Sequence, residues 1–169
     1  MLTIIKEKNK NTLFHIDAVQ AFGKYKIDVK KFKCDMLSAS AHKFNGPKGV
    51  GLFYMKKGLK VKPLLLGGGQ QSGQRPGTEN AAGAAAMAVA AQDAYKNLEE
   101  SNKKIYDLKK HLAERILREV SDSFLNGESV EEASPYVLNI GFKNIRSEVL
   151  LHALEEKGVV VSAGSACNS

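Results

Sequence analysis

The sequence is poor in several residue types, and each shortage excludes a class of protein. Its 169 residues include no tryptophan and only two cysteines, Cys34 and Cys167. Two cysteines cannot build a disulfide framework, and no spacing of cysteine and histidine predicts a zinc site. No apolar run is long enough to span a membrane, and the initial MLTIIK lacks the apolar core of a signal peptide. We therefore expect a cytoplasmic protein with no membrane partner and no metal.

Positive charge is in excess, but no binding motif accompanies it. The chain has 25 Lys and Arg residues against 18 Asp and Glu, a net charge of +7. Such an excess can attract nucleic acid or another anionic partner, or it can simply favour solubility. Several of the lysines lie between Lys24 and Lys33, without a nucleic-acid motif or an aromatic platform. This composition favours a solvated surface, and no nucleic-acid partner is expected.

One lysine differs from the others in its neighbours. Residues 38–43, with the sequence SASAHK, end a predicted buried strand at 34–40, and a Gly- and Pro-containing turn leads to a second predicted strand at 49–55. Lys43 should therefore lie just beyond the carboxyl end of the first strand, where open α/β sheets bind ligands. A lysine beside apolar surface and hydroxyls can attack a carbonyl and form a Schiff base. The alternative is an ordinary solvated lysine.

A carboxylate at another strand end gives Lys43 a chemical partner. Asp17 follows a β-branched and aromatic segment at 12–16, and could bind a metal, act as a base or hold a protonated ring nitrogen. It could equally cap a short helical segment that starts at residue 18. Gln20 could face the same pocket. A lysine imine together with an acid at the ring nitrogen is what a protein contributes to pyridoxal phosphate chemistry.

Four further residues are candidates for the same chemistry. Ser40 and His42 stand two apart in a segment expected to be extended, so their side chains should share one side and could bind a phosphate. Thr78 opens a predicted helix, where it could be a simple N-cap or a phosphate ligand. Cys167 lies in a loop of small residues and could be a nucleophile, although an isolated cysteine is more often incidental. Cys34 is expected to be a small core residue.

The remaining patterns predict two domains of different character. A Gly-rich loop at 67–77 precedes a helix at 80–95, and a second helical stretch covers 98–120, with a break near Asn97 because one straight helix would be too long. The other predicted elements are helices at 3–10 and 147–157 and strands at 123–125, 136–142 and 159–162. We expect an α/β fold, with a mixed, mostly parallel sheet in residues 1–97 and a small α+β domain in residues 98–169, joined by a long helix.

Five motifs together resemble the cysteine desulfurases of the NifS/IscS type, which belong to the class V aminotransferase group. The motifs are HIDAVQ (15–20), SAHKFNGPKG (40–49), GGGQ (67–70), RPGTEN (75–80) and SAGSAC (162–167). Each alone would be a weak signal, but their order and intervals are specific and cover nearly the whole chain. The resemblance implies the large domain of a pyridoxal-phosphate-dependent transferase of fold type I, followed by a small domain.

The resemblance also implies a role for each candidate residue. Lys43 would bind pyridoxal 5'-phosphate covalently, and Asp17 would pair with the pyridine nitrogen. Gln20 would contact the phenolic oxygen, and Ser40 and His42 the phosphate. Thr78 would reach the phosphate of the other subunit in a homodimer.

Cys167 would take sulfur from L-cysteine as a persulfide, leaving L-alanine. The sulfur would pass to an acceptor protein, such as an iron–sulfur scaffold or a tRNA-thiolation protein.

Members of this family are longer than this chain. We therefore expect a fragment that lacks the N-terminal half of the large domain, with the histidine that stacks on the cofactor ring, and the C-terminal end, with the arginine that binds the substrate carboxylate. No residue of the chain can be assigned those two roles. The alternatives are an inactive truncated fragment of such an enzyme, or an enzyme similar to selenocysteine lyase.

Overall fold

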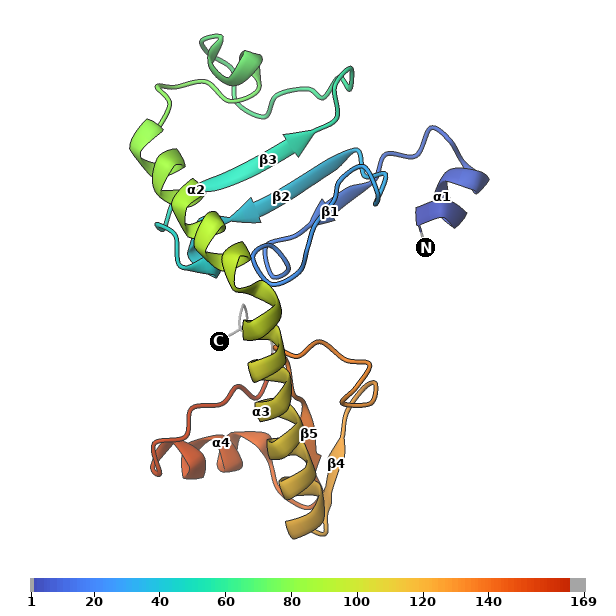
Figure 1. Cartoon of the computed structure of the whole chain (residues 1–169), viewed down its shortest axis with the longest axis vertical. Coiled ribbons are helices and arrows are strands. Elements are labelled where there is room, and N and C mark those ends of the chain that lie inside the picture. The colour runs from blue at the N-terminus through green and yellow to red at the C-terminus, as the bar shows by residue number, and fades with distance from the viewer. Residues whose placement is uncertain (1, 165–169) are drawn as a thin grey trace. The chain divides into compact units, whose positions relative to one another are not determined.

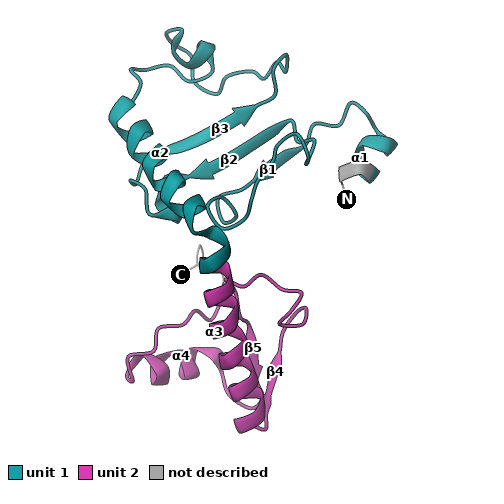
Figure 2. Ribbon diagram, viewed as in Figure 1, with its two compact units in different colours: residues 1–101 teal, residues 102–169 magenta. Residues whose placement is uncertain are grey.

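The structure, a computed structural model, describes residues 2–164, with the side chains of residues 2 and 3 left out. The chain forms two compact units, residues 1–101 and residues 102–169 (Figure 2). Each unit has its own sheet, and each is described separately. The described residues contain no helix long and apolar enough to cross a membrane.

A three-stranded mixed sheet forms the centre of the first unit (Figure 1). The central strand β2 (Met36–Ser40) pairs in parallel with β1 (His15–Asp17) and antiparallel with β3 (Gly51–Met55). The predicted α/β fold with a mixed sheet is confirmed. The first strand is shorter than the predicted 12–16 and is shifted toward Asp17, because the Phe14 N–H bonds to the Asp35 carboxylate rather than to a strand.

The two faces of the sheet have different chemistry. Leu37 and Ala39 of β2 are 2% and 4% exposed and pack with Ala18 and Cys34 in the core. Cys34 is thus the small core residue that the sequence predicts, and burial raises the pKa of its thiol. Since side chains alternate along a strand, Ser38 and Ser40 point to the opposite face. That face has no buried residue on β1, β2 or β3.

Helix α2 (Ala81–Lys96) packs against the turn that follows β2 in the first unit. Its residue Met87 packs against Ala41 and Phe44 of the 3-10 helix η1 (Ala41–Phe44), which follows β2. The hydroxyl of Tyr95, near the end of α2, accepts a hydrogen bond from the Gly23 N–H (3.4 Å). The predicted break is confirmed, because α2 ends at Lys96 and α3 (Leu98–Glu119) begins after a non-helical residue, Asn97 (φ −117°, ψ 25°).

Hydrogen bonds to Asp35 connect the amino ends of β1 and β2 with the short helix α1 (Leu2–Lys8). The side chain of Asp35 is nearly buried, and its Oδ2 accepts hydrogen bonds from Lys6 Nζ (2.6 Å) and from the Phe14 N–H (2.9 Å). Lys6 Nζ also donates to the Thr12 carbonyl (2.6 Å). The hydrogen bond from Lys6, assisted by that from Phe14 and by the charge of Lys56, holds the pKa of Asp35 below its usual value of 3.8.

The second unit contains β4 (Ser123–Leu125), β5 (Ile140–Phe142) and α4 (Ser147–Glu155), with β4 and β5 antiparallel. The predicted strand at 136–142 is reduced to β5. The predicted strand at 159–162 was wrong within the described residues. The Val159 N–H bonds to the Leu154 carbonyl (2.9 Å) and so extends the end of α4, and Val160 is 89% exposed.

A buried lysine holds the connection between β4 and β5. Lys109 of α3 is 6% exposed. Its ammonium donates to the carbonyls of Val130 (3.4 Å), Ala133 (3.5 Å) and Ser134 (2.9 Å). Three acceptors match the three protons of an ammonium group, so this cation can stay buried without a carboxylate.

Replacing Asp35 by Asn should destabilise the first unit in a pH-dependent way. At pH 7 we expect a loss of about 2 kcal/mol of unfolding free energy, the usual size for a charged hydrogen bond. The folded pKa of Asp35 is lowered, so its contribution is complete above 3.8 and is lost as the pH falls through the folded pKa. Urea unfolding at pH 7 and near pH 3 measures this, and the difference between wild type and Asp35→Asn should shrink at the lower pH. Asp107→Asn is the control, because Asp107 is exposed and makes no hydrogen bond within the described residues. An equal loss at both pH values would contradict the prediction.

Candidate functional site

The fold brings Asp17, Ser40, His42 and Lys43 to one edge of the sheet. Because β1 and β2 are parallel, their carboxyl ends meet there, with Asp17 in register with Ser38. Ser40 is the last residue of β2, and η1 carries His42 and Lys43 directly after it. This is the edge at which open α/β sheets bind ligands.

Asp17 has one oxygen engaged and one available. Its Oδ1 accepts a hydrogen bond from the Val19 N–H (2.9 Å), while the Ala18 N–H donates to the Ser38 carbonyl (2.8 Å). The carboxylate thus shapes the turn that follows β1, but the predicted helix that it would cap is absent, because residues 18–22 form turns. Its Oδ2 accepts no hydrogen bond from any described residue and can still receive one from a ligand.

Ser40 and His42 form a pair. Ser40 Oγ and His42 Nδ1 are 2.8 Å apart and hydrogen-bonded. The backbone differs from the expected extended segment, because Ser40 is extended (φ −128°, ψ 126°) whereas His42 lies in a 3-10 turn. The turn brings the imidazole back over the hydroxyl, so two groups that can bind an anion lie together.

Lys43 is exposed and makes no ion pair or hydrogen bond with another described residue. Its neighbours Ala41 and Phe44 are 0% and 5% exposed, so the turn that carries it is fixed to the core. Asn45 ends η1 in the left-handed region (φ 66°), and the Gly46 N–H donates to the Ala41 carbonyl (2.9 Å). A free amine on a rigid turn is suited to reach a ligand at this edge.

Gln20 and Thr78 form no hydrogen bond with the residues of this cluster in the described part of the chain. Gln20 is exposed on the turn after Asp17, and Thr78 is exposed before α2. Thr78 as the N-cap of α2 was wrong: Asn80 is the cap, and its Oδ1 accepts from the Gly83 N–H (2.9 Å). Cys167 lies outside the described residues.

The sequence interpretation missed a second row of side chains on the same face of the sheet. His15 Nε2 lies 3.2 Å from Ser38 Oγ, and the His15 ring meets Phe53 edge-on, with centroids 5.8 Å apart. The signal was present, because His15 precedes Asp17 by two residues and Ser38 precedes Ser40 by two. Period-two spacing places each pair on one side of its own strand, and the register of Asp17 with Ser38 puts both pairs on the same face.

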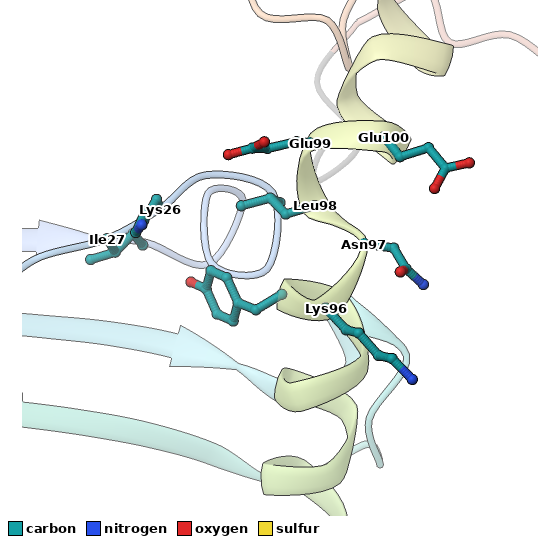
Figure 3. A pocket seen from close by; sticks show the side chains of 8 residues that line it. Lys26, Ile27, Lys96, Asn97, Leu98, Glu99 and Glu100 are labelled. Carbon is teal, nitrogen blue, oxygen red and sulfur yellow. The ribbon is translucent and has the colours of Figure 1, made fainter.

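A surface hollow elsewhere in the first unit does not coincide with these residues. Figure 3 shows it beside the helix break at Asn97. It is lined by Lys26, Ile27 and residues 95–100. None of the candidate residues that the structure describes lines this hollow, so it does not coincide with the cluster at the sheet edge.

The cluster at the sheet edge fits pyridoxal phosphate in its chemistry. Asp17 offers an unused carboxylate oxygen for a protonated ring nitrogen, Ser40 and His42 offer a hydroxyl and an imidazole for a phosphate, and Lys43 offers a free amine. A metal fits less well, because the described residues hold no group of three or more His, Cys, Asp or Glu side chains suited to bind one.

Comparison with known proteins gives a consistent result over the whole chain. The family described as Aminotransferase class-V matches residues 1–169. The chain is 44% identical to cysteine desulfurase IscS from Clostridium botulinum over 163 residues, which are 96% of this chain and 41% of that protein. It is also 44% identical to cysteine desulfurase IscS from Methanosarcina thermophila over 162 residues, which are 96% of this chain and 40% of that protein. A solved NifS-like protein superposes with a TM-score of 0.87 at 39% identity, covering 96% of this chain and 44% of that one. The chain thus spans about two fifths of the length of the curated relatives it matches.

The turn that carries Lys43 should not tolerate a side chain at Gly46. A Cβ at this position would lie 2.8 Å from Ala41 Cβ and 3.0 Å from the Ala41 carbonyl oxygen. These atoms cannot move away easily, because Ala41 is fully buried. We expect Gly46→Ala to lower the unfolding free energy by about 1–3 kcal/mol, the usual cost of overpacking. Gly69→Ala is the control, because Gly69 has open space around it and an ordinary φ of −81°. Denaturant unfolding of both variants measures the effect, and equal midpoints would contradict the prediction.

Proposed function

The chain belongs to the aminotransferase class-V family, and from this membership we propose that it acts as a pyridoxal-phosphate-dependent cysteine desulfurase. The reaction converts L-cysteine to L-alanine and moves the sulfur onto an enzyme cysteine. The single observation that carries the proposal is the meeting of Asp17, the Ser40–His42 pair and Lys43 at one sheet edge. The desulfurase names of relatives at 44% identity support the choice within the family.

Each residue of the edge has a task that follows from its position. Asp17 would hold a proton between its free Oδ2 and the ring nitrogen, with Oδ1 fixed by the Val19 N–H. Ser40 and His42 would bind the phosphate, and their mutual hydrogen bond keeps both groups in place. Gln20 would donate to the phenolic oxygen, and Thr78 would reach the phosphate of a second copy in a homodimer. Bound pyridoxal phosphate supplies a protonated ring that accepts electrons from the substrate's α-carbon.

Lys43 would bind the cofactor covalently through Nζ. The amine is exposed and free, while the buried side chains of Ala41 and Phe44 fix the backbone beneath it. The rigid turn therefore limits the positions that the amine can take, which favours one orientation of the bound group.

Cys167 would be the sulfur carrier, an assignment that rests on the SAGSAC motif at 162–167. Its thiolate would form an S–S bond with the substrate sulfur while the C–S bond breaks, and the carbon would take a proton and leave as alanine. The persulfide would then be passed to an acceptor protein, such as an iron–sulfur scaffold or a tRNA-thiolation protein. We also propose a cytoplasmic location and the domain division at residue 97.

Lys43→Ala should abolish covalent cofactor binding. Among the four described residues Asp17, Ser40, His42 and Lys43, only the lysine has an amine that can form an imine with the aldehyde of pyridoxal phosphate, so the absorbance of the bound cofactor should disappear. Borohydride reduction followed by peptide mass spectrometry should place the cofactor on Lys43 in the wild type. Lys48→Ala is the control, since Lys48 is an exposed lysine beyond the turn. A modified peptide that lacks Lys43, at wild-type yield, would refute the assignment.

The 169 residues by themselves should release little or no sulfide from L-cysteine. No residue of this sequence can be assigned to stack on the cofactor ring or to bind the substrate carboxylate, although the residues that we propose to bind the cofactor are present. The measurement is sulfide release with added pyridoxal phosphate, for the wild type and for Lys43→Ala. Robust turnover that Lys43→Ala abolishes would overturn this prediction while supporting the desulfurase assignment.

A further inference from the structure

One hydrogen bond between side chains joins β1 to β2 on the face that carries the candidate site. His15 Nε2 of β1 and Ser38 Oγ of β2 lie 3.2 Å apart. In the parallel pairing of these neighbouring strands (Figure 1), His15 is opposite Met36, and Asp17 is opposite Ser38. The imidazole therefore reaches two residues along β2, toward the carboxyl end of the strands, and bonds to the residue opposite Asp17.

A third strand holds the imidazole in this position. Phe53 of β3 is opposite Ser38 on the other side of β2. The Phe53 ring meets the His15 ring edge-on, with centroids 5.8 Å apart and an angle of 76° between the planes. Side-chain contacts between neighbouring strands stabilise their pairing. The His15 ring thus has partners on both β2 and β3, although His15 is an exposed residue.

The strand that ends in Asp17 has few other contacts to hold it against β2. Strand β1 contains only three residues, and directly after it the Ala18 N–H donates to the Ser38 carbonyl (2.8 Å). Within the described residues, the hydrogen bond between His15 and Ser38 is the only one that connects a side chain of β1 to β2. It therefore supplements the backbone pairing on which the position of Asp17 depends.

The groups proposed to bind the cofactor lie on two different strands. Asp17 ends β1, whereas Ser40 ends β2 and His42 follows it in η1. A rigid ligand that contacts all three side chains at once requires a fixed spacing between the two strand ends, because binding groups act together only when their geometry is right. A small anion bound by Ser40 and His42 has no such requirement.

We propose that His15 and Ser38 are positioning residues of this site. Their hydrogen bond keeps Asp17 at the spacing from Ser40 and His42 that one molecule with a ring nitrogen and a phosphate requires. The inference rests on the proposed function, because it takes pyridoxal phosphate as the ligand of this edge. A pair that only stabilised the sheet would affect every ligand of the edge equally, whereas a positioning pair matters for a ligand that contacts both strands.

The test is binding of two probes to the purified chain, pyridoxine 5'-phosphate and inorganic phosphate. Pyridoxine phosphate has the ring nitrogen and the phosphate but no aldehyde, so its affinity does not depend on a bond to Lys43. We expect His15→Phe, which keeps a ring beside Phe53, and Ser38→Ala each to weaken binding of pyridoxine phosphate about tenfold, the usual effect of losing one hydrogen bond. The affinity for inorganic phosphate should change less than about twofold.

Further variants and the spectrum of the ligand make the result specific. The double variant His15→Phe/Ser38→Ala should bind about as weakly as either single variant, because both changes remove the same hydrogen bond. Ser38→Thr keeps a hydroxyl and should retain wild-type affinity within about twofold. The ultraviolet spectrum of bound pyridoxine phosphate should show less protonated ring nitrogen in the single variants. The matched control is His111→Phe, since His111 is exposed in α3 and makes no hydrogen bond within the described residues.

The outcomes separate this inference from the proposed function. Equal binding of pyridoxine phosphate by the wild type and both single variants, or equal weakening of both probes, would overturn the inference alone. A wild type that does not bind pyridoxine phosphate would overturn the proposed function together with this inference. Nitrogen NMR of the His15 ring needs no variant. An Nε2 signal typical of a nitrogen without a hydrogen-bond partner, in the wild type with pyridoxine phosphate bound, would also contradict the inference.

Discussion

The pairing of β2 with two neighbours of opposite direction is the constraint on which the rest of the first unit depends. Parallel pairing with β1 puts Asp17 level with Ser38 and brings two carboxyl ends to one edge. Antiparallel pairing with β3 requires the chain to turn back at that same edge, and the turn is the 3-10 helix that carries His42 and Lys43. A parallel return would need a crossover connection and could not keep the lysine so close to the strand end. The mixed sheet therefore produces the cluster of acid, hydroxyl, imidazole and amine.

Along the five residues of β2, alternate side chains pack in the core or face the candidate site. Leu37 and Ala39 face the core, whereas Ser38 and Ser40 face the other side with His15 and Asp17. A slip of register by one residue would bury the hydroxyls and expose the core. The turn after β2 also needs small residues where it packs against itself. Ala41 is fully buried under the turn, and the contact distances at Gly46 leave no space for a methyl group. The packing that fixes the turn and the chemistry that it presents are thus set by adjacent residues.

Sequence reasoning succeeded for features set by Gly, Pro, alternation and helix length, and failed where the backbone path or distant residues decide. The turn at Lys43, the buried Cys34 and the break at Asn97 follow from Gly and Pro punctuation, alternation and helix length. The cap of α2 was assigned to Thr78 instead of Asn80, because both residues are good caps and only the backbone path decides between them. The apolar run at 159–162 has strand propensity but continues the end of α4 through the Val159 N–H. Neither the Asp35–Lys6 pair nor the burial of Lys109 over three carbonyls has a sequence signal, since each depends on residues more than 20 positions apart.

The carboxylates at the two ends of the small sheet differ in the partners that they already have. At the amino end of β2, Lys6 and the Phe14 N–H both bind the Asp35 carboxylate. At the carboxyl end, Asp17 keeps one oxygen free, beside a hydroxyl–imidazole pair that suits an anion. A ligand with both a cationic ring nitrogen and a phosphate matches the groups at the carboxyl end. One small sheet thus has a carboxylate that stabilises the fold at its amino end and a carboxylate with an available oxygen at its carboxyl end.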